Sequence, residues 1–158
     1  MTIEFDVKMT TSKMYDYMMK HNMTSFVGIL GVFLGALLVV SYFLYGKWLY
    51  LLCGVVIILY NPVDLYIKSA RQVKLNPLFK EPLHYIIDEE GITVRSGENE
   101  SSLPWSQMYK ATSTTSSVIL YTNMVNACIF PKSDMGDVKD DVIKMISTHM
   151  DPKRVNIR

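Results

Sequence analysis

The chain has 158 residues, a formal net charge of +1 and 49% apolar residues. This length leaves room for one small domain and a short membrane segment, and the near-neutral charge gives no reason to expect nucleic acid as a partner. The two cysteines, Cys53 and Cys128, are too few for a disulfide framework and suit a reducing cytoplasm.

Residues 1–24 predict a strand followed by a short helix. Apolar and charged residues alternate over residues 3–7, as in a strand with one buried face. Thr11 or Ser12 can cap a helix that ends near Met23. We expect the strand to join the sheet of the C-terminal domain, so that the segment between them is an insertion.

Residues 25–74 predict a transmembrane hairpin. Residues 25–45 are apolar and uncharged, and a second apolar run begins at Trp48 after only Gly46 and Lys47. As a helix, the first run is about 32 Å long, which matches a hydrocarbon core of about 30 Å. The two membrane helices are expected at about 25–45 and 48–67, and the second continues as a juxtamembrane helix.

Positive charges set the predicted orientation of this hairpin. Lysines and arginines precede and follow it, whereas its turn carries only Lys47. The positive-inside rule then places both termini in the cytoplasm, which predicts a multi-pass protein with a cytoplasmic C-terminal domain.

Three glycines, Gly28, Gly31 and Gly35, lie on nearly one face of the first membrane helix. Small residues at this spacing allow another helix to approach closely. The approaching helix is either the second helix of the same hairpin or a helix of another copy, which would make a homo-oligomer.

The second membrane helix contains Pro62, which lacks a backbone N–H and predicts a kink or a restart. Asp64 lies four residues before Lys68, so the two can pair on one helical face; alternatively, Asp64 lines an ion path. Lys68 and Arg71 are candidate contacts for anionic lipids at the membrane interface, or they serve only to hold this end inside.

Residues 75–82 contain two prolines and predict a linker. Residues 83–150 predict a β-rich domain closed by an amphipathic C-terminal helix, and the basic tail, residues 151–158, is expected to be loose. Trp105 follows a proline in a segment that should bend, and it either packs under this bend or forms an exposed recognition anchor.

Three segments of this domain carry a resemblance to a known family. They are YIIDEEGI at residues 85–92, the stretch from Ser101 to Trp105-Ser106, and ACIFPK at residues 127–132. In this order they resemble the YcxB-like family of bacterial membrane proteins. The resemblance implies a curved sheet capped by a C-terminal helix, similar to pleckstrin-homology-like (PH-like) modules, and a location in the bacterial cytoplasmic (inner) membrane. It implies no catalytic residues.

The sequence also lacks the common signatures of catalysis and of cofactor binding. No phosphate loop, GxGxxG, CxxC, HExxH or GxSxG occurs, and the three histidines lie in different predicted elements. We therefore expect no cofactor, no metal site and no enzymatic activity.

The predicted fold class is an α+β membrane protein, with a transmembrane helical hairpin and a small antiparallel β domain. The expected function is that of a membrane-anchored cytoplasmic interaction module, which presents a sheet edge or the Trp105 region to a protein partner. The alternative is a small oligomeric transport or channel component that assembles through Gly28, Gly31 and Gly35, with Asp64 lining the path.

Overall fold

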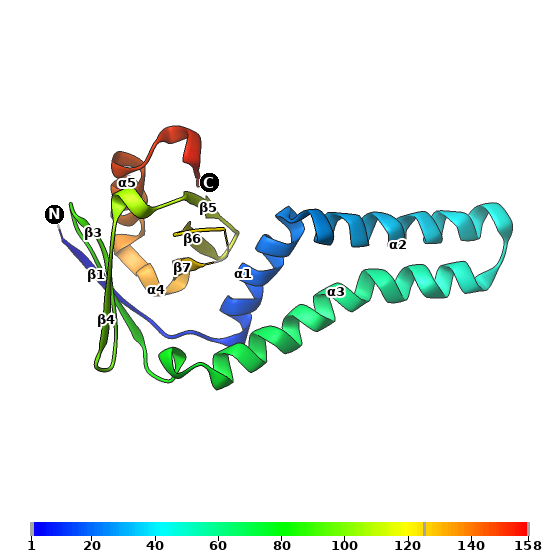
Figure 1. The fold of residues 1–158 in the computed structure, drawn as a ribbon, viewed down its shortest axis with the longest axis horizontal. Coiled ribbons are helices and arrows are strands. Elements are labelled where there is room, and N and C mark those ends of the chain that lie inside the picture. Colours follow the sequence, from blue (N-terminus) through cyan, green and yellow to red (C-terminus); the bar gives the residue numbers. More distant parts are fainter. Residues whose placement is uncertain (1, 125, 158) are drawn as a thin grey trace.

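A hairpin of two long helices projects from a domain built on two sheets (Figure 1). The computed structural model describes residues 2–124 and 126–157. Helix α2 (Phe26–Tyr45) and helix α3 (Trp48–Leu75) are both long and apolar enough to cross a membrane. Most of their side chains lie outside the packed interior, which is unlike a core helix of a soluble domain.

Helix α3 is continuous, with Pro62 inside it. The predicted membrane helix and its juxtamembrane extension are therefore one element, and the sequence could not decide this. Proline removes one backbone hydrogen bond from a helix. α3 packs against both α2 and α1 (Thr11–Thr24).

Helix α1 connects the domain to the hairpin. Its N-cap is Thr10, whose side-chain oxygen accepts a hydrogen bond from the backbone N–H of Lys13, so the helix begins one residue earlier than the predicted caps allow. Met14 is buried in the domain core, and Tyr15 packs edge-on against Tyr66 of α3 at 5.7 Å between ring centroids. One helix thus contacts both the core and the hairpin.

The first sheet is antiparallel and has the order β1-β2-β3-β4. Its strands are β1 (Ile3–Val7), β2 (Leu83–Ile87), β3 (Gly91–Ser96) and β4 (Asn99–Pro104). β1 pairs with β2 although the whole hairpin separates them in the sequence. The N-terminal strand therefore belongs to the C-terminal domain.

The second sheet has the order β7-β6-β5-β8. Its strands are β5 (Lys110–Ser113), β6 (Ser117–Tyr121), β7 (Ala127–Pro131) and the two-residue β8 (Val155–Asn156), which pairs with β5 in parallel. The expectation of a loose tail is wrong for these residues. A 3-10 turn at Pro152–Arg154, capped by Asp151, directs β8 onto the sheet edge.

The C-terminal helical segment is divided at Gly136. A short helix α4 (Lys132–Met135) precedes this glycine, whose φ of 50° interrupts the helix, and α5 (Lys139–His149) follows after a 3-10 turn. Residues of both sheets, α1 and α5 form the hydrophobic core. The predicted α+β class, with antiparallel sheets and a C-terminal helix, is confirmed.

Candidate functional site

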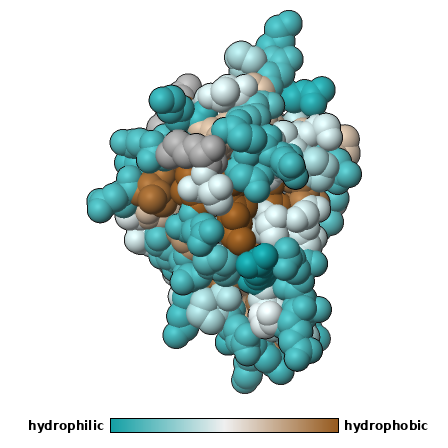
Figure 2. All heavy atoms as spheres, turned by 90° about the vertical axis from the view of Figure 1, so that its left-hand side faces the viewer, coloured by the Kyte–Doolittle hydropathy of each residue, from teal (hydrophilic) through white to brown (hydrophobic). Residues whose placement is uncertain are grey.

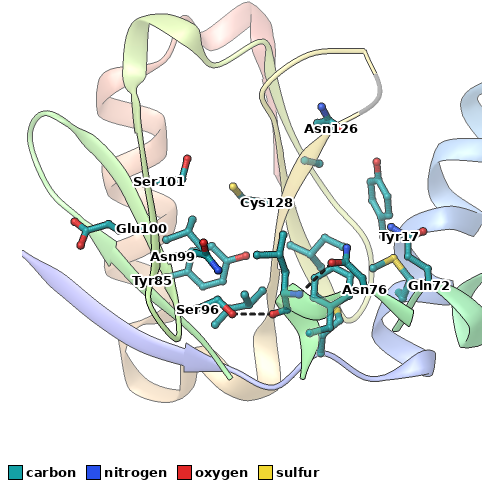
Figure 3. Close-up of a pocket in the computed structure, with 18 residues that line it drawn as sticks. Tyr17, Gln72, Asn76, Tyr85, Ser96, Asn99, Glu100, Ser101, Asn126 and Cys128 are labelled. Atoms are coloured by element: carbon teal, nitrogen blue, oxygen red, sulfur yellow. Dashed lines mark hydrogen bonds between the residues drawn. The ribbon is translucent and has the colours of Figure 1, made fainter. Parts of the chain in front are cut away.

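A pocket of about 360 Å³ lies between the two sheets, at the end of the domain that joins the helices. Strands β4 and β7 flank it, as Figure 3 shows for Asn99 and Ser101 on one side and Cys128 on the other. β4 pairs only with β3 and β7 only with β6 among the described residues, so each has one edge without a partner strand. The pocket thus separates two unpaired edges.

The face of β4 that lines the pocket is polar and exposed, unlike the buried apolar face of a core strand. Asn99 and Ser101 line the pocket and are exposed, whereas their partners on β3, Ser96 and Val94, are more buried. Polar residues at these positions keep this side of the sheet in contact with solvent. The two sheets consequently do not close on each other here.

Tyr85 contributes to the apolar floor of the pocket. Its ring packs edge-on against Phe130 at 4.9 Å and is stacked on Phe5 at 5.6 Å between centroids. Burial raises the pKa of the Tyr85 phenol well above its ordinary value. Burial likewise raises the pKa of the Cys128 thiol to about 12, so both groups are neutral at physiological pH.

The remaining polar groups of the pocket are mostly uncharged. Asn76, Asn99, Ser101 and Asn126 contribute amides and hydroxyls, and the one carboxylate among the lining residues, Glu100, is paired with Arg95 at 2.8 Å. The pocket therefore combines an apolar floor with neutral hydrogen-bonding groups. Such a lining suits a peptide segment better than a charged small molecule.

The mouth of the pocket is formed partly by the helices. Met14 and Tyr17 of α1 and Gln72 of α3 contribute to it, together with Asn76 at the end of α3. The predicted linker, residues 75–82, is held in place here. Asn76 Oδ1 accepts a hydrogen bond from the N–H of Leu78, and Ser96 Oγ donates to the Leu78 carbonyl (Figure 3).

Other side-chain contacts fasten α1 to the domain. Lys13 Nζ lies 2.6 Å from Asp134 Oδ2, and Thr114 Oγ1 donates a hydrogen bond to Asp16. Tyr17 packs beside Tyr121 at 6.1 Å between centroids. Helix α1 therefore contacts the pocket, the domain and, through Tyr15, the hairpin.

Trp105, the predicted recognition residue, is 8% exposed. Its indole N–H donates a hydrogen bond to the carbonyl of Asp88 at 2.9 Å, and its ring stacks on His149 at 5.1 Å. His149 in turn lies 3.0 Å from Glu89. This is the packing role that the sequence left open, and the exposed-anchor alternative must be corrected because little indole surface is accessible.

The three predicted packing glycines all face segments of their own chain. A Cβ on Gly35 would lie 2.6 Å from Ile58 and 3.1 Å from the carbonyl oxygen of Gly54, both on α3. A Cβ on Gly31 would lie 3.5 Å from Asn61, and one on Gly28 would clash with the backbone of Asn22 in α1. The glycine face is used within the hairpin and at its junction with α1.

The predicted interface residues lie on the domain-proximal half of α3. Asp64 and Lys68 form an ion pair of 2.6 Å one helical turn apart. Arg71 lies on the following turn and lines a shallow depression together with Lys68 and Met18. Among the described residues, no group of three or more His, Cys, Asp and Glu side chains could hold a metal ion.

Residues 87–146 match the model of the YcxB-like protein family. The matched segment runs from the end of β2 into α5, so the predicted resemblance to this family is confirmed there. No curated protein and no solved structure matches the chain. The proposed likeness to PH-like domains therefore stays a prediction.

Sequence reasoning missed this pocket. Its signal was the polar stretch NESS at residues 99–102, which forms most of an edge strand. Polar residues at alternate positions of a strand beside a buried sheet are a usable sign of an open edge.

Proposed function

We propose that the protein is a membrane-anchored interaction module that binds an extended segment of a partner protein between β4 and β7. The observation that carries this proposal is the pocket between the two unpaired strand edges. An unpaired edge offers backbone N–H and C=O groups to an added strand, and a pocket beside it accepts a side chain of that strand.

The other two sheet edges, β1 and β8, are less suited to pairing with an added strand. α4 packs beside β1, and β8 is only two residues long. β4 and β7 each have five or six residues. A strand added between them would bridge the two sheets and cover the exposed inner face of β4.

The module is anchored by α2 and α3, which we propose cross the bacterial inner membrane with both chain ends in the cytoplasm. Large apolar side chains on the hairpin are exposed, for example Phe26 at 79% and Phe43 at 77%. The opposite end of the molecule is mainly hydrophilic (Figure 2). A cysteine introduced at Lys47 should then react with an impermeant maleimide from outside the cell, and its protection there would contradict this topology.

The binding is proposed to be non-catalytic. The pocket's thiol and phenol are both neutral, because burial raises the pKa of Cys128 and of Tyr85. A neutral thiol is a poor nucleophile. The alternative of an oligomeric channel has less support, since Gly28, Gly31 and Gly35 all face their own chain.

The proposal is tested with a photoreactive residue at Ser101, which lines the pocket, and at Ser102, which faces the other side of β4 beside Thr93. The two positions are adjacent and start from the same residue type. In intact cells, crosslinking to a partner is expected from position 101 and not from position 102.

A synthetic peptide of the crosslinked segment then checks the binding mode. Added to the purified full-length protein, it should slow hydrogen exchange of the backbone amides of β4 and β7. A peptide that binds without slowing exchange in these strands, or equal crosslinking from both positions, would overturn strand addition.

A further inference from the structure

The mouth of the pocket between β4 and β7 lies on the side of the domain that joins the helices. Tyr17 of α1 and Gln72 of α3 contribute to it, and Figure 3 shows both on the helix side of the pocket. Both helices lead directly to the proposed membrane spans, because α3 contains one span and α2 begins two residues after α1 ends. The distance from the mouth to the membrane therefore follows from helix geometry.

Both helices place the mouth about 8–10 Å from the hydrocarbon core of the membrane. α3 begins at Trp48, and about 20 of its residues fill a core of about 30 Å, so Gln72 lies about 8 Å beyond this core. Tyr17 lies about 10 Å along α1 from Thr24, its last residue. The headgroup layer is itself about 5–8 Å thick. The mouth consequently opens next to the lipid headgroups.

The space between the mouth and the membrane has room for an extended chain but not for a folded domain. Neighbouring strands lie about 5 Å apart and stacked sheets about 10 Å apart, whereas a domain of about 100 residues has a radius of gyration of about 13 Å. A segment that leaves the pocket on this side therefore continues as an extended chain. About three residues, at about 3.3 Å each, bring it to the membrane.

The lining of the pocket favours an uncharged side chain. Asn99, Ser101 and Cys128 are neutral, and Glu100, the one charged residue in the described lining, is paired with Arg95. A charged side chain would lose its hydration here and find no free opposite charge. The volume of about 360 Å³ is at the lower end of the range for ligand pockets, which suits one large apolar side chain.

A partner in the same membrane would compensate for the small size of this contact. One pocket and one strand edge of five or six residues offer much less than the roughly 800 Å² per partner of a standard interface. A segment held in the same bilayer meets the pocket at a high effective concentration, which strengthens binding without any new contact.

We infer that the partner is an integral membrane protein, bound through the extended cytoplasmic segment that adjoins one of its transmembrane helices. A large uncharged apolar side chain of this segment occupies the pocket. The inference rests on the proposed membrane anchoring and strand addition, and it adds where in the partner the bound segment lies and which kind of side chain it carries.

The test uses the full-length protein in intact cells, with the photoreactive residue at Ser101 and identification of the crosslinked peptide by mass spectrometry. We expect a peptide that lies within about ten residues of a transmembrane helix of its own protein, on the cytoplasmic side. A peptide from a protein without such a helix, or one more than about 20 residues away from it, would overturn the inference while strand addition stands. No crosslink from position 101 would overturn both.

Two variants in the same cells test the choice of an uncharged side chain. Asn99→Asp adds a carboxylate to the lining of the pocket, and Ser102→Asp adds one on the other side of the same strand. Both positions are exposed, so both variants should unfold at about the wild-type temperature.

We expect Asn99→Asp to lower the yield of crosslinked partner about tenfold, because the bound segment would remove water from the new carboxylate. Ser102→Asp should leave the yield unchanged. A higher yield in Asn99→Asp would mean that the segment brings a positive charge to the pocket, and an equal decrease in both variants would mean that the pocket does not select the side chain. Either result would overturn the assignment of an uncharged side chain.

Discussion

The sheet domain buries its large apolar side chains, whereas the hairpin exposes them and buries glycines. In β6, all five residues are buried, and they include Ile119, Leu120 and Tyr121. In α2, the only buried residues are Gly28 and Gly35, while Phe26 and Phe43 lie outside. The domain is stabilised by removing large apolar side chains from water, whereas the hairpin is held by close backbone approach and turns its large side chains outward.

The proposed membrane anchoring of the hairpin accounts for this difference. Exposing so many apolar side chains would be unfavourable in water, but lipid tails are as apolar as the side chains themselves. The same substitution should therefore have different consequences in the two regions, and matched pairs of variants can test this.

The largest expected effect comes from Phe130→Ala. Phe130 is fully buried and contacts the rings of Phe5 and Tyr85, so its truncation should lower the free energy of unfolding by about 3–5 kcal/mol. Phe33→Ala is the matched variant in the hairpin, where Phe33 is 58% exposed, and it should change this free energy by less than about 0.5 kcal/mol.

Thermal unfolding of the full-length protein in detergent, followed by tryptophan fluorescence, measures both. If Phe33→Ala destabilised the protein as much as Phe130→Ala, the hairpin would be packed like the domain, and the contrast between the two regions would be wrong.

The second effect concerns the glycines of the hairpin. A Cβ on Gly54 would lie 2.8 Å from the carbonyl oxygen of Gly35 and 3.0 Å from the backbone N of Val39, so Gly54→Ala must push the two helices apart. We expect a loss of about 1–3 kcal/mol. Gly31→Ala meets only an ordinary contact of 3.5 Å with Asn61 and should be tolerated.

Fluorescence of Trp48, at the start of α3, reports this loss on heating. Equal stability of the Gly54→Ala and Gly31→Ala variants would mean that close backbone approach does not hold the hairpin together.

Local patterns were sufficient for the elements that are regular in themselves. The alternation at Ile3–Val7 gave the bounds of β1, and the apolar run gave α2 to within one residue. These elements show their buried or exposed apolar side directly in the order of their residues.

Local patterns failed where pairing with a distant segment decides the structure. β4 is polar and is a strand because it pairs with β3, and β8 exists because β5 offers an edge. α3 likewise continues through Pro62 while it packs against two neighbouring helices, which its own sequence does not show. The pocket between β4 and β7 is lined by residues far apart in the chain, such as Tyr17 and Cys128, which no short motif can bring together.

A smaller effect distinguishes packing from recognition at Trp105. Trp105→Phe keeps an aromatic ring beside His149 but leaves the Asp88 carbonyl without its donor, so we expect a loss of about 1–2 kcal/mol in the free energy of unfolding. Trp48→Phe is the control, because Trp48 is 70% exposed at the hairpin turn, and it should be nearly neutral.

Circular dichroism on heating can follow both tryptophan variants. Crosslinking from position 101 should be unchanged in Trp105→Phe if Trp105 serves the core alone. Unchanged stability together with lost crosslinking would instead restore the recognition role.

The smallest effect is a dependence of domain stability on alkaline pH. Burial raises the pKa of the Cys128 thiol from 9.0 to about 12. Well below pH 9 the thiol is protonated in both the folded and the unfolded chain, so its contribution to stability is complete there. Above this pH the unfolded chain loses the proton first, and stability falls as the pH rises toward the folded-state pKa. Between about pH 8.5 and 9.5 this one group should reduce the free energy of unfolding by about 0.7 kcal/mol.

Unfolding measured at both pH values tests this contribution. The free energy of unfolding should decrease less in Cys128→Ala, whereas in Cys53→Ala, which keeps the buried thiol, it should decrease as in the wild type. If all three proteins lost the same stability, the thiol would have to be solvated when folded, and the pocket between β4 and β7 would be open to water down to Cys128.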